Sequence, residues 1–108
     1  MESFGTLIRR IRTAKGLLLR EVAASLRIDP SYLSRIESNT KRATREHVIQ
    51  LAAFLKADEN ELLIAYLSDK IIYELQGEKL AMKAMSVAEQ KIRYLTFLSH
   101  TSTDTSKK

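Results

Sequence analysis

The sequence predicts an all-α protein, and three observations lead to this fold class. Apolar residues recur every three or four positions along almost the whole chain, as they do on the buried face of a helix. Glycine and proline, which interrupt helices, occur only three times and once in 108 residues. The alternation of apolar and polar residues that indicates a half-buried strand is absent. A chain of this length forms one domain, or one small domain with an appendage.

The first three helices are expected in the first third of the chain. The first runs from about Phe4 to Lys15, and Gly16 ends it because glycine readily takes the left-handed backbone that follows many helices. The second covers about residues 18–26. Asp29 is a good N-cap for the third helix, and Pro30 takes its first position, where a missing N–H costs nothing. The residues expected to face the core are Phe4, Leu7, Ile8, Ile11, Val22, Ala23, Leu26, Leu33 and Ile36.

Two more helices are expected after a basic loop at residues 39–43. Thr44 is the N-cap of a helix over about residues 45–55, whose inward side carries valine, alanine and leucine. Asp58, with Glu61 three residues later, has a pattern like a capping box and begins the fifth helix.

Gly77 separates the fifth helix from a sixth, expected over about residues 78–99 with an alanine, methionine and leucine stripe. The plain interpretation of residues 58–99 is an antiparallel helical hairpin. The last segment, residues 100–108, is rich in threonine, serine and lysine, and we expect it to be a disordered tail.

The composition excludes several classes of protein. Cysteine is absent, and His47 and His100 lack the spacing of metal ligands, so we expect no metal site and no cofactor. No apolar run approaches the ~18 residues of a membrane span, and the N-terminus does not resemble a signal peptide. No nucleophile–base pair or glycine-rich phosphate loop indicates an enzyme. We expect a cytoplasmic protein with no small-molecule ligand.

Residues 18–39 carry the most informative pattern of the chain. They form two short amphipathic helices joined by a tight turn, and the outer side of the second helix is polar and basic. A helix-turn-helix presents its recognition helix to the major groove of DNA in this way. The pattern therefore predicts a protein that binds specific DNA.

The positive charge lies in the same half of the chain as this pattern. Residues 1–56 hold eleven lysines and arginines against five acids, a net +6, whereas residues 57–108 hold seven against eight, a net −1. A basic surface attracts phosphates and releases counterions on contact. Charge alone is equally compatible with a solvated surface, but charge that coincides with the motif favours nucleic-acid binding.

The motif resembles the helix-turn-helix of the Cro/repressor family of small phage and bacterial regulators, and the resemblance covers about residues 5–67. It implies a five-helix DNA-binding domain over residues 1–67, followed by a long C-terminal helix. The buried Ala23 fits the crossing of the second and third helices, where a larger side chain would wedge them apart. The residues that carry the resemblance are Ala23, Ile28, Tyr32, Leu33, Ile36 and Glu37.

The resemblance also implies roles for individual residues. Arg35 is the strongest base-reading candidate, because a guanidinium can bond guanine O6 and N7 together. Arg12 and Glu37 match a pair that forms a partly buried ion pair in similar repressors. The other base-reading candidates are Pro30, Ser31, Tyr32 and Ser34, and the candidates for phosphate binding are Arg20, Asn39, Lys41, Arg42 and Arg45.

The sequence departs from the family pattern at two places. Arg27 stands where the turn usually has glycine, so we expect a strained left-handed residue that costs about 1 kcal/mol. Leu18 and Leu19 stand where a Ser/Thr cap and a phosphate-binding glutamine usually open the second helix, so both are lost. Leu17 completes an apolar run on the DNA side, of which one or two members can be core.

The resemblance implies a homodimer on double-stranded DNA. Twofold regulators of this kind read palindromic operators whose half-sites are roughly 34 Å apart. The sixth helix could instead fold back on its own core. The residues expected at the dimer interface are Leu63, Tyr66, Leu67, Ile71, Met85 and Ile92.

Three functions remain open from the sequence. The first is an autoregulatory transcription factor, a repressor or activator, that resembles controller proteins of restriction–modification operons. The second is an antitoxin that represses its own operon and grips a toxin with its C-terminal half. The third is an adaptor that uses the helix-turn-helix for protein contact, which the lost glutamine favours and the basic first half disfavours.

Overall fold

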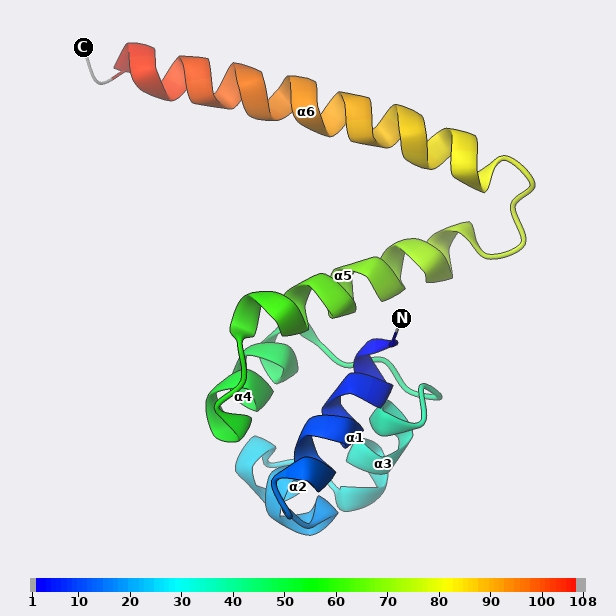
Figure 1. The fold of residues 1–108 in the computed structure, drawn as a ribbon, viewed down its shortest axis with the longest axis vertical. Coiled ribbons are helices and arrows are strands. Elements are labelled where there is room, and N and C mark those ends of the chain that lie inside the picture. The colour runs from blue at the N-terminus through cyan, green and yellow to red at the C-terminus, as the bar shows by residue number, and fades with distance from the viewer. Residues whose placement is uncertain (1, 107–108) are drawn as a thin grey trace. The chain divides into compact units, whose positions relative to one another are not determined.

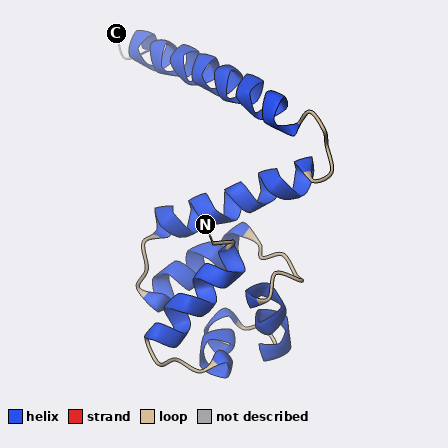
Figure 2. Ribbon diagram, turned by 45° about the vertical axis from the view of Figure 1, so that its right-hand side comes forward, coloured by secondary structure: helices blue, strands red, loops and turns tan. Residues whose placement is uncertain are grey.

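The computed structural model describes residues 2–106 and contains six helices and no strand in that range (Figures 1 and 2). Its contacts divide the chain into two compact units, residues 1–74 and 75–108. The six helices and the absence of strands among the described residues confirm the all-α prediction. The helices are α1 (Phe4–Ala14), α2 (Leu19–Leu26), α3 (Pro30–Glu37), α4 (Arg45–Leu55), α5 (Glu59–Leu75) and α6 (Ala81–Ser106).

Three helices of the first unit, α1, α3 and α4, begin at polar caps. Ser3 accepts the backbone N–H of Thr6 on its hydroxyl, and Asp29 accepts that of Ser31. Thr44 accepts the N–H of His47, and His47 Nδ1 accepts the N–H of Thr44 in return. These bonds satisfy donors that a helix start leaves without partners, which is why the cap residues could be located from the sequence.

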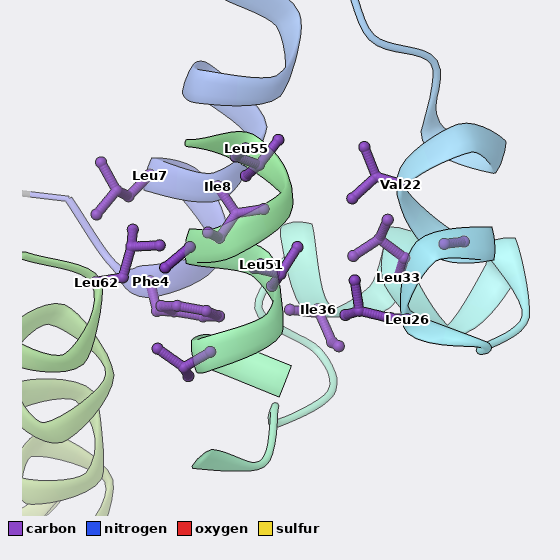
Figure 3. Packing of buried hydrophobic residues seen from close by; sticks show 13 residues of the cluster. Phe4, Leu7, Ile8, Val22, Leu26, Leu33, Ile36, Leu51, Leu55 and Leu62 are labelled. Atoms are coloured by element: carbon purple, nitrogen blue, oxygen red, sulfur yellow. The ribbon is translucent and has the colours of Figure 1, made fainter. Parts of the chain in front are cut away.

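The core of the first unit gathers side chains from α1 to α4 and one residue of α5 (Figure 3). Ile8, Leu33 and Leu51 have no exposed surface, and Leu62 brings the start of α5 into the same cluster. Because α3 contributes only Leu33 and Ile36 to this core, its remaining sides are left for other contacts. The core thus fixes which face of α3 is presented to solvent.

The second unit is formed by the end of α5, a turn and α6. Gly77 has φ +82°, a backbone conformation that side chains disfavour, and it ends the fifth helix as expected. Every described side chain from Met82 to His100 is exposed. No helix among the described residues is long and apolar enough to cross a membrane.

The extent of α6 differs from the sequence expectation. The helix begins at Ala81, three residues after the expected start, and continues to Ser106, where the sequence analysis expected a disordered tail from His100. Serine and threonine are weak helix formers in the interior of a helix. Extending an existing helix is nevertheless easier than starting one, because each added residue gains a hydrogen bond. Lys107 and Lys108 lie outside the described residues.

Candidate nucleic-acid interface

A left-handed residue makes the turn between α2 and α3. Arg27 has φ 58° and ψ 40°, as expected for a residue in the usual glycine position. The N–H of Arg27 donates to the carbonyl of Ala24, and the N–H of Ile28 donates to that of Ala23, each at 3.1 Å. Ala23 is fully buried where the two helices meet. The hydrogen bonds and the small residue together define the angle at which α3 is held.

The start of α2 has no side-chain cap, because Leu18 occupies the N-cap position. Glu21 partly compensates, since its Oε1 accepts the N–H of Leu18 at 2.9 Å. Leu17 and Leu19 are partly buried against the core, whereas Leu18 is 49% exposed. One residue of the apolar run is therefore left at the surface and two are packing residues.

The outward face of α3 carries most of the base-reading candidates. Ser31, Ser34 and Arg35 are all exposed, and residues three and four apart lie on one side of a helix. Pro30 is exposed at the first position of the helix. This face is opposite to Leu33 and Ile36, which are buried. It is polar, carries one cation and matches what a major-groove helix presents to base edges.

Ser31 is engaged before any ligand arrives. Its backbone N–H and its hydroxyl both donate to Asp29 Oδ1 at 2.8 Å. The backbone hydrogen bond is the main reason that the pKa of Asp29 is lowered below its usual value; the hydroxyl and the charge of Arg35 lower it further. Because the Ser31 hydroxyl donates its hydrogen to Asp29, its oxygen remains free to accept a hydrogen bond, for example from a base amine.

Tyr32 packs within its own unit. Its ring is partly buried and meets the His47 ring edge-on at a centroid distance of 5.7 Å, with Lys41 Nζ 5.4 Å from the tyrosine centroid. The structure therefore places Tyr32 between α3 and the start of α4, separate from the exposed line of Ser31 and Arg35. From the sequence, His47 was considered only as a possible metal ligand.

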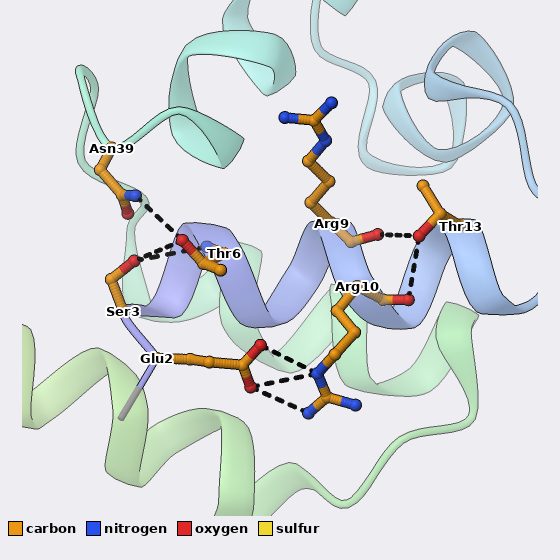
Figure 4. A network of polar contacts seen from close by, with 7 residues as sticks. All are labelled: Glu2, Ser3, Thr6, Arg9, Arg10, Thr13 and Asn39. Carbon is orange, nitrogen blue, oxygen red and sulfur yellow. Dashed lines mark hydrogen bonds and ion pairs between the residues drawn. The ribbon is translucent and has the colours of Figure 1, made fainter.

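The candidate phosphate-binding cations lie on the elements directly before and after α3 in the chain. Arg20, Lys41, Arg42 and Arg45 are all exposed. Asn39 has a left-handed backbone with φ 64°, and its Nδ2 donates to Thr6 Oγ1 at 3.3 Å (Figure 4). That hydrogen bond ties the start of the basic loop to α1.

Arg12 and Glu37 form a nearly buried ion pair between α1 and the end of α3. Arg12 Nε and Nη2 donate to the two carboxylate oxygens at 2.7 and 3.0 Å, and Nη1 donates to the carbonyl of Leu17 at 2.9 Å. The side chains are only 13% and 5% exposed. The hydrogen bonds to Glu37 are the main reason that the pKa of Arg12 is raised. The ion pair therefore attaches the last residue of α3 to α1.

Several residues around the interface escaped the sequence analysis. Gly5 lies where α1 meets the last turn of α3, with no room for a side chain. Asp69 accepts the N–H of Phe4 at 2.7 Å, and the Tyr73 ring lies under the guanidinium of Arg42 at 4.3 Å. A glycine inside an amphipathic helix could have indicated the first of these. Nothing local indicates the other two, because their partners lie far away in sequence.

Comparison with known proteins agrees with this geometry. A helix-turn-helix family model matches residues 8–62. Two solved structures of the clp gene regulator ClgR from Corynebacterium glutamicum are similar. One has 32% identity and a TM-score of 0.53 over 61% of this chain and 86% of that chain. The other has 26% identity and a TM-score of 0.54 over 90% and 89%. A search of curated proteins gave no match.

The family match covers α2 and α3 together with most of the core that holds them. The chain belongs to the helix-turn-helix family of the Cro/repressor type, whose members are DNA-binding transcriptional regulators. The second ClgR structure extends the similarity to most of the chain, so the relationship is not restricted to the motif.

Proposed function

We propose that this regulator binds a palindromic operator as a homodimer and reads it with the exposed face of α3. The observation that carries the proposal is the position of Arg35. It is exposed in the last turn of α3, on the same side as Ser31 and Ser34 and directly before the basic loop. A cation between a polar helix face and a basic loop can reach a base edge while neighbouring cations hold phosphates.

Replacing Arg35 by alanine is expected to remove sequence specificity. A bidentate arginine–guanine contact is worth about 1–3 kcal/mol against the wrong base, so the preference for the operator should fall by about five- to 150-fold. Arg93→Ala in α6 removes the same charge from an exposed site and is the matched control. The measurement is the affinity of wild type and both variants for the DNA upstream of the protein's own gene, divided by their affinity for an unrelated duplex. It is repeated over a series of salt concentrations. Equal preference in wild type and Arg35→Ala would refute the base contact.

The dimer proposal rests on the side of α5 that turns away from the core. Ile64, Leu67 and Ile71 are exposed there, while Leu63 and Tyr66 are partly buried against the unit's own core. In α6, Met85 and Ile92 are exposed as well. Apolar helix faces of this extent on a small protein are typical of surfaces that another chain covers. A second copy supplies the same faces and gives the twofold symmetry of a palindromic site.

Ile71→Asp is expected to shift the protein from dimer to monomer, because a carboxylate would be buried without a partner at the interface. Ile49→Asp in α4 is the matched control, since Ile49 and Ile71 are 41% and 44% exposed. Sedimentation equilibrium on the full chain measures the mass. A dimer with Ile71→Asp, or a monomeric wild type, would contradict the α5 interface.

A DNA-binding regulator of this kind could control one of two kinds of target genes, or could act as an antitoxin with a protein partner. The organisation of the chain suits an autoregulatory controller of a restriction–modification operon, and the similarity to ClgR suits control of a clp-type gene set. The exposed apolar side chains of α6 also suit an antitoxin that grips a toxin. Sequencing of the DNA bound by the protein, together with the neighbouring genes, separates the three.

A further inference from the structure

We infer that Tyr73 is a positioning residue for DNA binding: it holds the guanidinium of Arg42 with its N–H edges directed to a backbone phosphate. The inference rests on the proposed DNA-binding function and adds a residue of α5 to it. Tyr73 lies 31 positions after Arg42 in the sequence and outside the segment that the family model matches.

The contact with Tyr73 leaves the hydrogen-bond donors of Arg42 available to a ligand. Its guanidinium carbon is 4.3 Å from the centroid of the Tyr73 ring. Within the described part of the chain, Arg42 donates no hydrogen bond and forms no ion pair. The ring offers no lone pair to these donors, so the guanidinium that lies over it keeps its N–H groups for another acceptor. Those donors suit the paired oxygens of a phosphate.

Tyr73 is held in place by the residues before it on α5. Leu62, Tyr66, Asp69 and Tyr73 are three or four positions apart and share one side of the helix. Leu62 is buried in the core, and Tyr66 meets Phe4 edge-on at 6.1 Å. Asp69 accepts the N–H of Phe4 at 2.7 Å, where a carboxylate also faces the positive end of α1. Helix α5 is therefore bound to α1 at Asp69, one helical turn before Tyr73.

The loop that carries Arg42 is also held at its start, residues 39–41. The N–H groups of Thr40 and Lys41 both donate to the carbonyl of Arg35, at 2.9 and 3.2 Å. Asn39 is bound to Thr6, as described above. A guanidinium that rests on a ring, on a loop whose start is tied down, loses less conformational freedom on binding than an unheld side chain does. Because a phosphate contact carries no sequence information, the effect of Tyr73 should be the same on any duplex.

The test is a double-mutant cycle on a short duplex of arbitrary sequence. Tyr73→Leu should weaken binding about two- to fivefold, the effect of losing an exposed cation–π contact. Arg42→Ala should weaken it further and reduce the slope of log affinity against log salt by about 0.9. In the Arg42→Ala background, Tyr73→Leu should have no effect. Tyr73→Phe keeps a ring and should restore wild-type binding.

Tyr94→Leu is the matched control, since Tyr94 lies in α6 and is 62% exposed against 60% for Tyr73. It should bind as wild type does. Thermal melting of each variant shows that it is folded. Equal losses from Tyr73→Leu with and without Arg42, or a Tyr73→Phe protein as weak as Tyr73→Leu, would overturn the inference while leaving DNA binding intact. Failure of the wild type to bind any duplex would instead overturn the proposed function, and this inference with it.

Discussion

Gly5→Ala is expected to destabilise the protein by about 2 kcal/mol or more. A Cβ at this position would lie 2.1 Å from the carbonyl oxygen of Ile36 and 2.6 Å from Asn39 Oδ1. Alanine should otherwise favour a helix by about 1 kcal/mol over glycine. The clash is with backbone, however, so relief requires α1 and α3 to separate, and overpacking of this kind costs about 1–3 kcal/mol or more. Urea unfolding followed by circular dichroism measures the difference.

Gly16→Ala is the control for this substitution. Gly16 has φ +68° and open space around the position of a Cβ, so alanine there has backbone strain of roughly 1 kcal/mol and no clash. The gap between the two variants isolates the close approach of α1 to α3. If Gly5→Ala were as stable as wild type, α1 and α3 would have to lie farther apart than the structure shows.

Glu37→Gln is expected to lower the free energy of unfolding by about 2–4 kcal/mol. The substitution keeps the shape of the side chain but leaves the Arg12 guanidinium, 13% exposed, without a counter-charge. Removing one partner of a buried pair is costly because the other charge stays desolvated. Since Glu37 is the last residue of α3, operator affinity should also fall at temperatures where wild type is fully folded.

Glu2→Gln provides the comparison. Glu2 pairs with Arg10 through hydrogen bonds of 2.9 to 3.1 Å, but the two side chains are 35% and 58% exposed (Figure 4). Water replaces such a contact, so the free energy of unfolding should change little. Chemical denaturation of the three proteins under the same conditions checks both expectations. A loss from Glu2→Gln that equals the loss from Glu37→Gln would mean that burial does not determine the value of these pairs.

The close approach at Gly5, the Arg12–Glu37 ion pair and the basic loop all lie at the C-terminal end of α3. Gly5 and Arg12 belong to α1, Glu37 ends α3, and Asn39 begins the loop that binds back to Thr6. Helix α3 is thus held from behind by α1. Among the described residues, the only hydrogen bond made by a side chain of its exposed face is the one from the Ser31 hydroxyl to Asp29. Variants at this junction should act on stability first and on DNA affinity through it.

Much of the local structure could be predicted from the sequence. The caps at Asp29 and Thr44, the left-handed Arg27 and the apolar spacing each depend on residues within one or two turns of each other. Local hydrogen bonds and periodicity determine such features, so a single sequence contains the information for them. The resemblance to Cro/repressor proteins supplied the class of function, and the family match confirmed it.

The remaining features were decided by tertiary structure. Tyr32 could have faced DNA or the domain, and only the position of His47 on α4 places it inward. Asp69 and Tyr73 are ordinary surface residues in the sequence, yet they lie against Phe4 and Arg42 because Leu62 anchors α5 to the core and sets its rotation. Periodicity determines which residues share a face, but the partner of that face depends on how distant helices pack. The sequence therefore determined the motif and its outward charges, and packing determined which of those charges are already held in position.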